Sequence, residues 1–342
     1  MEYKVYEILA KIAVQHNLDI NKEEDTKKLL SIFENRIKEL GKRPTFVYGK
    51  RSENAFFELV KALDSIKLIK EEDIGRTGSS VEIKVPDFRI VTKNDEVFLV
   101  EVKNFAAKMS SKSIKKHTVY TLTQNYWRRL KTYSELVKTP VKIAIFWKSW
   151  GAWTLNEIED FRSSGIQRKI TFGEAMKNNQ MYIIGDKSIG TESPLSFRLL
   201  MEPRPVDTSS HESNIASKIV AVEMCSQGNI IHDKELSKLA YILFWFGRWE
   251  QKGPFPIIQG TLFYGIEFIA KPVEETEGQG FDMIAALSGM YMNMYHLMTH
   301  KGEDLPDVYL RQELPPITKI LPENPFHRGL PLWIFVQTPP ST

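Results

Sequence analysis

A short hairpin that carries charged residues inside two strands constrains the fold of this chain more than any other feature. The stretch "VPDFRIVTKNDEVFLVEVKN" spans residues 85–104, and its two apolar runs are joined by "TKND", a composition typical of a turn. Because side chains alternate in direction along a strand, Val100 and Val102 share one face, and Glu101 and Lys103 share the other. The first face is suited to a protein core. The second places a carboxylate and an ammonium side by side.

The aspartate of the first strand makes this pair more specific. An acid followed two residues later by lysine occurs five times in the chain, but only Glu101–Lys103 follows a Pro-Asp at hairpin distance. Asp87 on the partner strand can bring a second carboxylate close to Glu101. Two such carboxylates repel each other, and a divalent cation such as Mg²⁺ or Mn²⁺ would explain why they are placed together. The simpler alternative is a surface hairpin with a Glu–Lys ion pair, which adds little stability.

The order of elements in the first two thirds of the chain predicts a mixed α/β sheet covered by helices. Apolar residues at helical spacing predict two N-terminal helices within residues 1–40, and Ser52 is expected to cap a third. Further elements are expected in this order: an extended piece at 44–49, a helix at 118–138, a buried strand at 141–147, a helix at 154–165 and a strand at 180–186.

A change in composition predicts where the chain divides. The stretch "MEPRPVDTSSHES", residues 201–213, has two prolines, three serines and no apolar periodicity. We therefore expect an N-terminal helical segment at 1–45, a central domain at 46–202 and a C-terminal domain at 212–342. The C-terminal domain is expected to be α+β, with helices at 214–225, 233–246 and 281–298 and a strand at 261–270. Its role could be recognition, dimerisation or control.

Charge is unevenly distributed along the chain. The net charge is only +3, yet residues 103–148 hold eleven Lys or Arg and a single acid, Glu135. A local excess of this kind attracts polyanions such as nucleic acids, although it is also compatible with a solvated helix and loop.

Composition also excludes several classes of protein. Cys225 is the single cysteine, so the chain can form no internal disulfide and no cysteine-based zinc cage. The first fifteen residues carry charges throughout, and the most apolar runs are too short or too polar to span a bilayer. These features predict a cytoplasmic protein without membrane segments.

The hairpin resembles the PD-(D/E)xK nuclease superfamily, which includes restriction endonucleases and Holliday-junction resolvases. The resemblance covers about residues 46–190, through "VPDFRI" and "FLVEVKN" and the order of elements. It implies a restriction-endonuclease-like mixed central sheet flanked by helices. It also implies that Asp87, Glu101 and the carbonyl of Val102 bind Mg²⁺, with Mn²⁺ able to substitute, and that Lys103 is the catalytic lysine.

Other residues follow from the same resemblance. The superfamily usually adds a glutamate from the preceding helix, and "GKRSENAFFELVKAL" offers Glu53 or Glu58, of which Glu53 fits better as a catalytic metal ligand. A helix acid that interacts with the helix dipole is the alternative for either residue. Nucleic-acid contacts are expected from the helix after the lysine strand and from the basic segment before it: Gln124, Arg128, Lys131, Lys108, Lys112, Lys115 and Lys116. Arg128 stands where the "QxxxY" motif of the recombination branch would have a tyrosine.

These features together predict a Mg²⁺-dependent endodeoxyribonuclease that acts in restriction or defence, or in DNA recombination or repair. Cutting both strands of a duplex takes two active sites, which favours a homodimer. Two alternatives stay open at this point. One is a nuclease-like module that binds nucleic acid or a partner without hydrolysis, and the other is a member of the superfamily that cleaves RNA.

Overall fold

The structure, a computed structural model, describes residues 2–73, 77–106, 118–206, 218–272, 278–300, 307–312, 316–322, 326–327 and 329–340. Within these ranges the chain is a mixed α/β protein, as the order of elements predicts. The helices are α1 (Glu2–Gln15), α2 (Glu23–Gly41), α3 (Pro44–Ala62), α4 (Gln124–Leu136), α5 (Phe172–Lys177), α6 (Lys234–Phe246) and α7 (Leu287–Thr299). None of these described helices is both long and apolar enough to cross a membrane.

A five-stranded sheet contains the hairpin. Its spatial order is β1-β2-β3-β5-β6, and β3 and β5 are parallel while the other neighbours are antiparallel. The strands are β1 (Ile66–Glu71), β2 (Phe88–Thr92), β3 (Val97–Phe105), β5 (Val141–Trp147) and β6 (Ala152–Glu157). The predicted hairpin is confirmed, but its first strand begins only at Phe88, so the strand expected over 81–91 is shorter and Pro86 and Asp87 precede it; the predicted strand at 141–147 is confirmed. Strand β1 was not expected from the sequence.

The two faces of β3 pack against different helices. Val100 and Val102 belong to a core cluster that contains the apolar side of α3. Leu99 points to the opposite face and packs with Trp127 of α4. Glu101 shares the face of Leu99 because side chains alternate, and it is completely buried. The charged face of the hairpin therefore lies under α4 rather than in solvent.

The third helix begins earlier than the sequence predicts. Residues 44–49 are the first turns of α3 instead of an extended piece, because Pro44 at the first helical position loses no hydrogen bond there. Ser52 is not a cap. Its hydroxyl lies inside the helix and donates to the Tyr48 carbonyl at 2.9 Å. The earlier start adds two turns to α3 ahead of Glu53.

The region after the hairpin is richer in strands than predicted. The helix expected at 118–138 starts at Gln124, because the β-branched run before it forms β4 (Val119–Thr123) and Thr123 caps α4 by accepting from the Tyr126 amide at 3.2 Å. Strand β4 pairs with β8 (Gln167–Thr171), which pairs with β7 (Arg162–Ser164). The helix predicted at 154–165 is wrong, since sheet pairing takes Thr154 and its neighbours into β6, and the strand predicted at 180–186 is a 3₁₀ turn.

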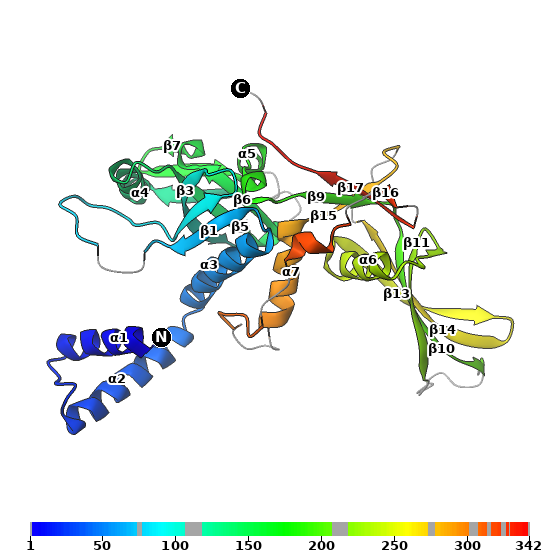
Figure 1. Cartoon of the computed structure of the whole chain (residues 1–342), viewed down its shortest axis with the longest axis horizontal. Coiled ribbons are helices and arrows are strands. Elements are labelled where there is room, and N and C mark those ends of the chain that lie inside the picture. The colour runs from blue at the N-terminus through cyan, green and yellow to red at the C-terminus, as the bar shows by residue number, and fades with distance from the viewer. Residues whose placement is uncertain are drawn as a thin grey trace.

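The C-terminal third adds two further sheets, of order β12-β11-β10-β14-β13 and β15-β9-β17-β16. Figure 1 shows the long hairpins of the first of these at the end of the molecule opposite α1 and α2. Helix α6 and a strand over most of 261–270 are confirmed, whereas the helix expected at 281–298 begins only after β15, at Leu287. The strands are β9 (Ser188–Thr191), β10 (Leu195–Pro205), β11 (Ile219–Ser226), β12 (Asn229–Ile230), β13 (Trp249–Gln259), β14 (Leu262–Pro272), β15 (Asp282–Ala286), β16 (Phe326–His327) and β17 (Leu330–Phe335).

The predicted boundary at 201–213 begins inside β10, and its residues 207–213 lie outside the described part of the chain. Strand β10 pairs with β11, so the helix predicted at 214–225 is wrong; its β-branched run "IVAV" favours a strand. One core cluster also includes Phe56 and Val100 from before this point and Phe244 and Leu332 from after it. Strand pairing and core packing thus connect residues on both sides of the predicted boundary, and the division into domains stays a prediction. Strand β9 pairs with β15 on one side and β17 on the other, which extends this connection.

Arg51 on α3 connects the central sheet to α7. Its guanidinium donates to the Thr299 hydroxyl at 2.7 Å and lies over the Tyr295 ring at 5.2 Å from the ring centre. We expect Arg51→Ala to lower the free energy of unfolding by about 1–3 kcal/mol, because a partly buried charged hydrogen bond and a cation–π contact are lost. Urea denaturation measures the change. Arg36→Ala on an exposed face of α2 is the control, and an equal effect of the two substitutions would contradict this role.

Candidate active site

Asp87 lies immediately before β2, and the neighbouring strand fixes its carboxylate. Its Oδ2 accepts a hydrogen bond from the backbone N–H of Val102 at 2.7 Å, and its own carbonyl accepts from the Glu72 amide at 2.9 Å. The residue is only 6% exposed. The hairpin thus brings Asp87 to the middle of β3, next to Glu101, as the sequence predicts.

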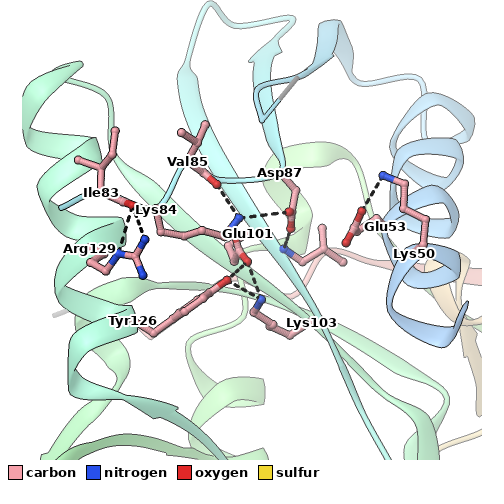
Figure 2. Close-up of polar contacts among 11 residues, drawn as sticks. Lys50, Glu53, Ile83, Lys84, Val85, Asp87, Glu101, Lys103, Tyr126 and Arg129 are labelled. Atoms are coloured by element: carbon pink, nitrogen blue, oxygen red, sulfur yellow. Dashed lines mark hydrogen bonds and ion pairs between the residues drawn. The ribbon is translucent and has the colours of Figure 1, made fainter. Parts of the chain in front are cut away.

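Glu101 is surrounded by groups that can donate a proton or carry positive charge (Figure 2). Its Oε1 accepts from the Lys103 ammonium at 2.5 Å and from the hydroxyl of Tyr126. Lys103 also donates to the Tyr126 hydroxyl at 2.8 Å, so the three side chains form a closed triangle. One residue of β3, Lys103, and one residue of α4, Tyr126, therefore hold the carboxylate in place.

The second carboxylate oxygen of Glu101 has fewer partners than the first. Oε2 is buried and has no hydrogen-bond partner in the described part of the chain. The Lys84 ammonium lies 3.6 Å from it, which is an ion pair beyond hydrogen-bonding distance. The same ammonium lies 4.0 Å from Oδ1 of Asp87. One cation of the protein therefore stands between the two carboxylates.

Burial and like charge perturb the acids and phenols of the site. Burial, together with the nearby charge of Glu101, raises the pKa of Asp87 to about 7, against the opposing effect of the Val102 N–H. Burial, followed by the charge of Glu101, also raises the pKa of Tyr126, so its phenol stays protonated and can donate. The site thus holds its carboxylates together at an electrostatic cost.

The structure separates the two candidate glutamates of α3. Glu53 pairs with Lys50 at 2.9 Å, and its charge is near enough to help raise the pKa of Asp87. Figure 2 shows it on the α3 side of Asp87. Glu58 pairs with Lys61 at 3.0 Å, and it is not among the groups that perturb Asp87. Glu53 is therefore the better placed of the two, although within the described part of the chain its carboxylate pairs with Lys50 and forms no hydrogen bond with Asp87.

The donor set suits a hard cation that keeps much of its water. In the described ranges no group of three or more His, Cys, Asp or Glu side chains is placed to hold a metal ion. Mg²⁺, however, binds through one or two carboxylates and retains several waters. Asp87 and Glu101, with a buried carboxylate oxygen that lacks a hydrogen bond, fit that mode of binding.

Three of the residues expected to bind nucleic acid are described, and each pairs with a residue outside this cluster. Gln124 accepts from Arg168 at 2.9 Å, Arg128 lies 3.7 Å from Glu82, and Lys131 lies 3.3 Å from Glu159. The structure thus brings none of them into contact with the carboxylates. Lys108, Lys112, Lys115 and Lys116 lie outside the described residues.

Sequence reasoning missed two residues of the site. Tyr126 lies two positions after Gln124 near the start of α4, a spacing that does not match "QxxxY". Lys84 belongs to "EIKVPD", another acid-to-lysine spacing that looked like ordinary solvated charge. Its position three residues before Asp87 was the available signal.

No family model and no characterised protein matches the sequence significantly. The chain is similar to a solved structure of Hjc, a Holliday junction resolvase from the archaeal hyperthermophile Archaeoglobus fulgidus. The similarity covers 40% of this chain and 96% of that one, at 16% identity and a TM-score of 0.29. A similarity of this strength establishes neither fold nor function, so the site has to be interpreted from its own geometry.

Asp87→Asn tests the electrostatic cost of the site. Because the pKa of Asp87 is raised from 3.8 to about 7, folding favours its protonated form, and the stability this contributes is complete below pH 4 and lost as the pH rises through 7. In EDTA the variant should exceed the wild type in stability by about 1–4 kcal/mol at pH 8, and the difference should shrink toward pH 4. Thermal unfolding across this range measures it. A gain in stability of the variant that does not depend on pH would contradict an electrostatic cost at Asp87.

Proposed function

We propose that the protein is a Mg²⁺-dependent nuclease of the PD-(D/E)xK type that hydrolyses DNA phosphodiester bonds. The observation that carries this proposal is the pair of buried carboxylates, Asp87 and Glu101, with Lys103 two residues further along the same strand. A stable core does not require two acids at this position, since their proximity raises the pKa of Asp87. A site that binds a divalent cation does.

Each residue then has a defined role. Asp87, Glu101 and the Val102 carbonyl would hold the metal, with Glu53 reached through water. When bound, Mg²⁺ supplies Lewis-acid stabilisation of the phosphate and a bound water of lowered pKa. Lys103 stabilises negative charge on the phosphate as water adds to phosphorus and the bond to the leaving oxygen breaks. Tyr126 is a positioning residue, because its hydroxyl bonds both Lys103 and Glu101.

A nucleic-acid substrate agrees with the basic segment that follows the site. Arg128 and Lys131 on α4 form ion pairs with partly or largely exposed acids, and such pairs are weak enough to be exchanged for phosphate contacts. The lysines between β3 and β4 would add affinity without sequence specificity. We propose DNA as the substrate and a homodimer for cutting duplexes, in restriction or defence or in recombination and repair. RNA is the alternative substrate.

A cleavage assay tests the proposal. Plasmid, single-stranded DNA and RNA are incubated with wild type, Asp87→Ala and Lys103→Ala in Mg²⁺, Mn²⁺ or EDTA. We expect metal-dependent cutting that falls by about 10²-fold or more in both variants, because each loses a group that acts on the transition state. Lys67→Met, which removes an exposed ion pair with Asp95 at the hairpin turn, should cut normally. Cutting that persists in EDTA, or in both variants, would contradict the proposal.

One observation favours a second candidate, a binding module that does not cut. Lys84 and Lys103 already place two positive charges against the carboxylates, so the cluster can exist without a metal. The same assay separates the candidates. A folded wild type that shifts DNA or RNA in a gel but cleaves neither in any metal would support the module.

Tyr126→Phe tests the positioning role. It removes one hydroxyl, so Lys103 and Glu101 lose a shared hydrogen-bond partner while the ring remains. We expect kcat for cleavage to fall about tenfold with little change in KM, since the hydroxyl acts through Lys103. Tyr120→Phe is the matched control. No hydrogen bond of its hydroxyl is found in the described residues, although burial and then the nearby charge of Glu101 raise its pKa. Equal kcat values for the two variants would remove Tyr126 from the mechanism.

A further inference from the structure

The ammonium of Lys84 lies between the two carboxylates of the site. Its ammonium lies 3.6 Å from Glu101 Oε2 and 4.0 Å from Asp87 Oδ1, so it faces one oxygen of each carboxylate (Figure 2). Those two oxygens differ from the ones engaged elsewhere. Oδ2 of Asp87 accepts from Val102, and Oε1 of Glu101 accepts from Lys103. Lys84 therefore meets the oxygens that remain for a cation.

The backbone of Lys84 is held by α4, whereas its side chain is partly exposed to solvent. Its N–H donates to the Arg129 carbonyl at 3.1 Å, and the Arg129 guanidinium donates to the Ile83 carbonyl at 3.2 and 2.9 Å. These contacts hold the segment before Asp87 on α4. Because the lysine side chain is 28% exposed, it has a route to solvent that needs no movement of the sheet.

The two lysines at Glu101 are held with different strength. Lys103 makes hydrogen bonds to Glu101 at 2.5 Å and Tyr126 at 2.8 Å, and it also lies over the Tyr126 ring. Within the described chain, the hydrogen bond of the Lys84 ammonium goes to the Val85 carbonyl at 2.7 Å, and no carboxylate lies within hydrogen-bond reach. Lys84 is thus the cation that can leave at lower cost.

We propose that Lys84 is an internal counter-cation that neutralises Asp87 and Glu101 when no metal is bound, and that a divalent cation binds by displacing it. This inference rests on the proposed function, because it concerns the same carboxylates. A divalent ion and an ammonium repel strongly at such separations, so the two cannot share the oxygens. Displacement lowers metal affinity, and it moves a positive charge to the edge of the site, where a phosphate of the substrate can meet it.

Mn²⁺ binding in the absence of substrate tests this directly. Free Mn²⁺ is measured by electron paramagnetic resonance during titration of wild type, Lys84→Met, Lys84→Gln and the control Lys67→Met. We expect both Lys84 variants to bind Mn²⁺ about tenfold more tightly than wild type, because the competing charge is gone, and the control to bind as wild type does. In EDTA the Lys84 variants should unfold at lower temperature, and saturating Mn²⁺ should raise their melting temperature more than that of wild type.

The outcomes separate the inference from the function on which it rests. Wild type that binds Mn²⁺ at this site, with Lys84 variants of equal or weaker affinity, would overturn the displacement and leave the nuclease intact. The two substitutions guard against a folding defect in either one, and circular dichroism verifies the fold of both. If Asp87→Ala fails to alter Mn²⁺ binding, or no protein binds the ion, the metal site and this inference both fall.

Discussion

The hydrogen bond from the Val102 amide to the Asp87 carboxylate is the contact on which the site depends. It connects the residue before β2 to the middle of β3, where the side chain of Glu101 faces α4. Without it, Asp87 would have no reason to stay beside a second buried acid, since the two repel. A backbone N–H is suited to this purpose because β3 packs against a hydrophobic cluster on each of its faces. Rotation of a side chain cannot remove such a donor.

Packing of the surrounding fold offsets the destabilising repulsion between the two buried carboxylates. One face of β3 packs against α3 and the other against α4, so its position is determined from both sides. The acids sit on the α4 side together with Tyr126 and two lysines, and the compensating positive charge comes from different elements. Part of the free energy of the core is thus spent on keeping like charges close, as is common where binding or catalysis matters more than stability.

A feature of the fold or the site can be predicted from the sequence when the residues that determine it are close together in the chain. The hairpin, the alternation of Val102 with Glu101, and the position of Asp87 follow from period-2 patterning and were predicted. The strand at 219–226 was mistaken for a helix because its apolar residues satisfy both periods over so short a run, and pairing with β10 decides between them. Tyr126 joins the site through tertiary contacts alone, whereas the position of Lys84 three residues before Asp87 is a local signal.

The pairing of β9 with β17 has a consequence for how the protein is made. Residues 188–191 lie in the middle of their sheet, yet one neighbour is the strand at 330–335, and Leu330 and Leu332 complete the core that also holds Phe56 and Val100. The chain emerges from the ribosome N-terminus first. This core therefore stays incomplete until the strand at 330–335 has been synthesised. The long-range pairing therefore delays completion of this core during synthesis.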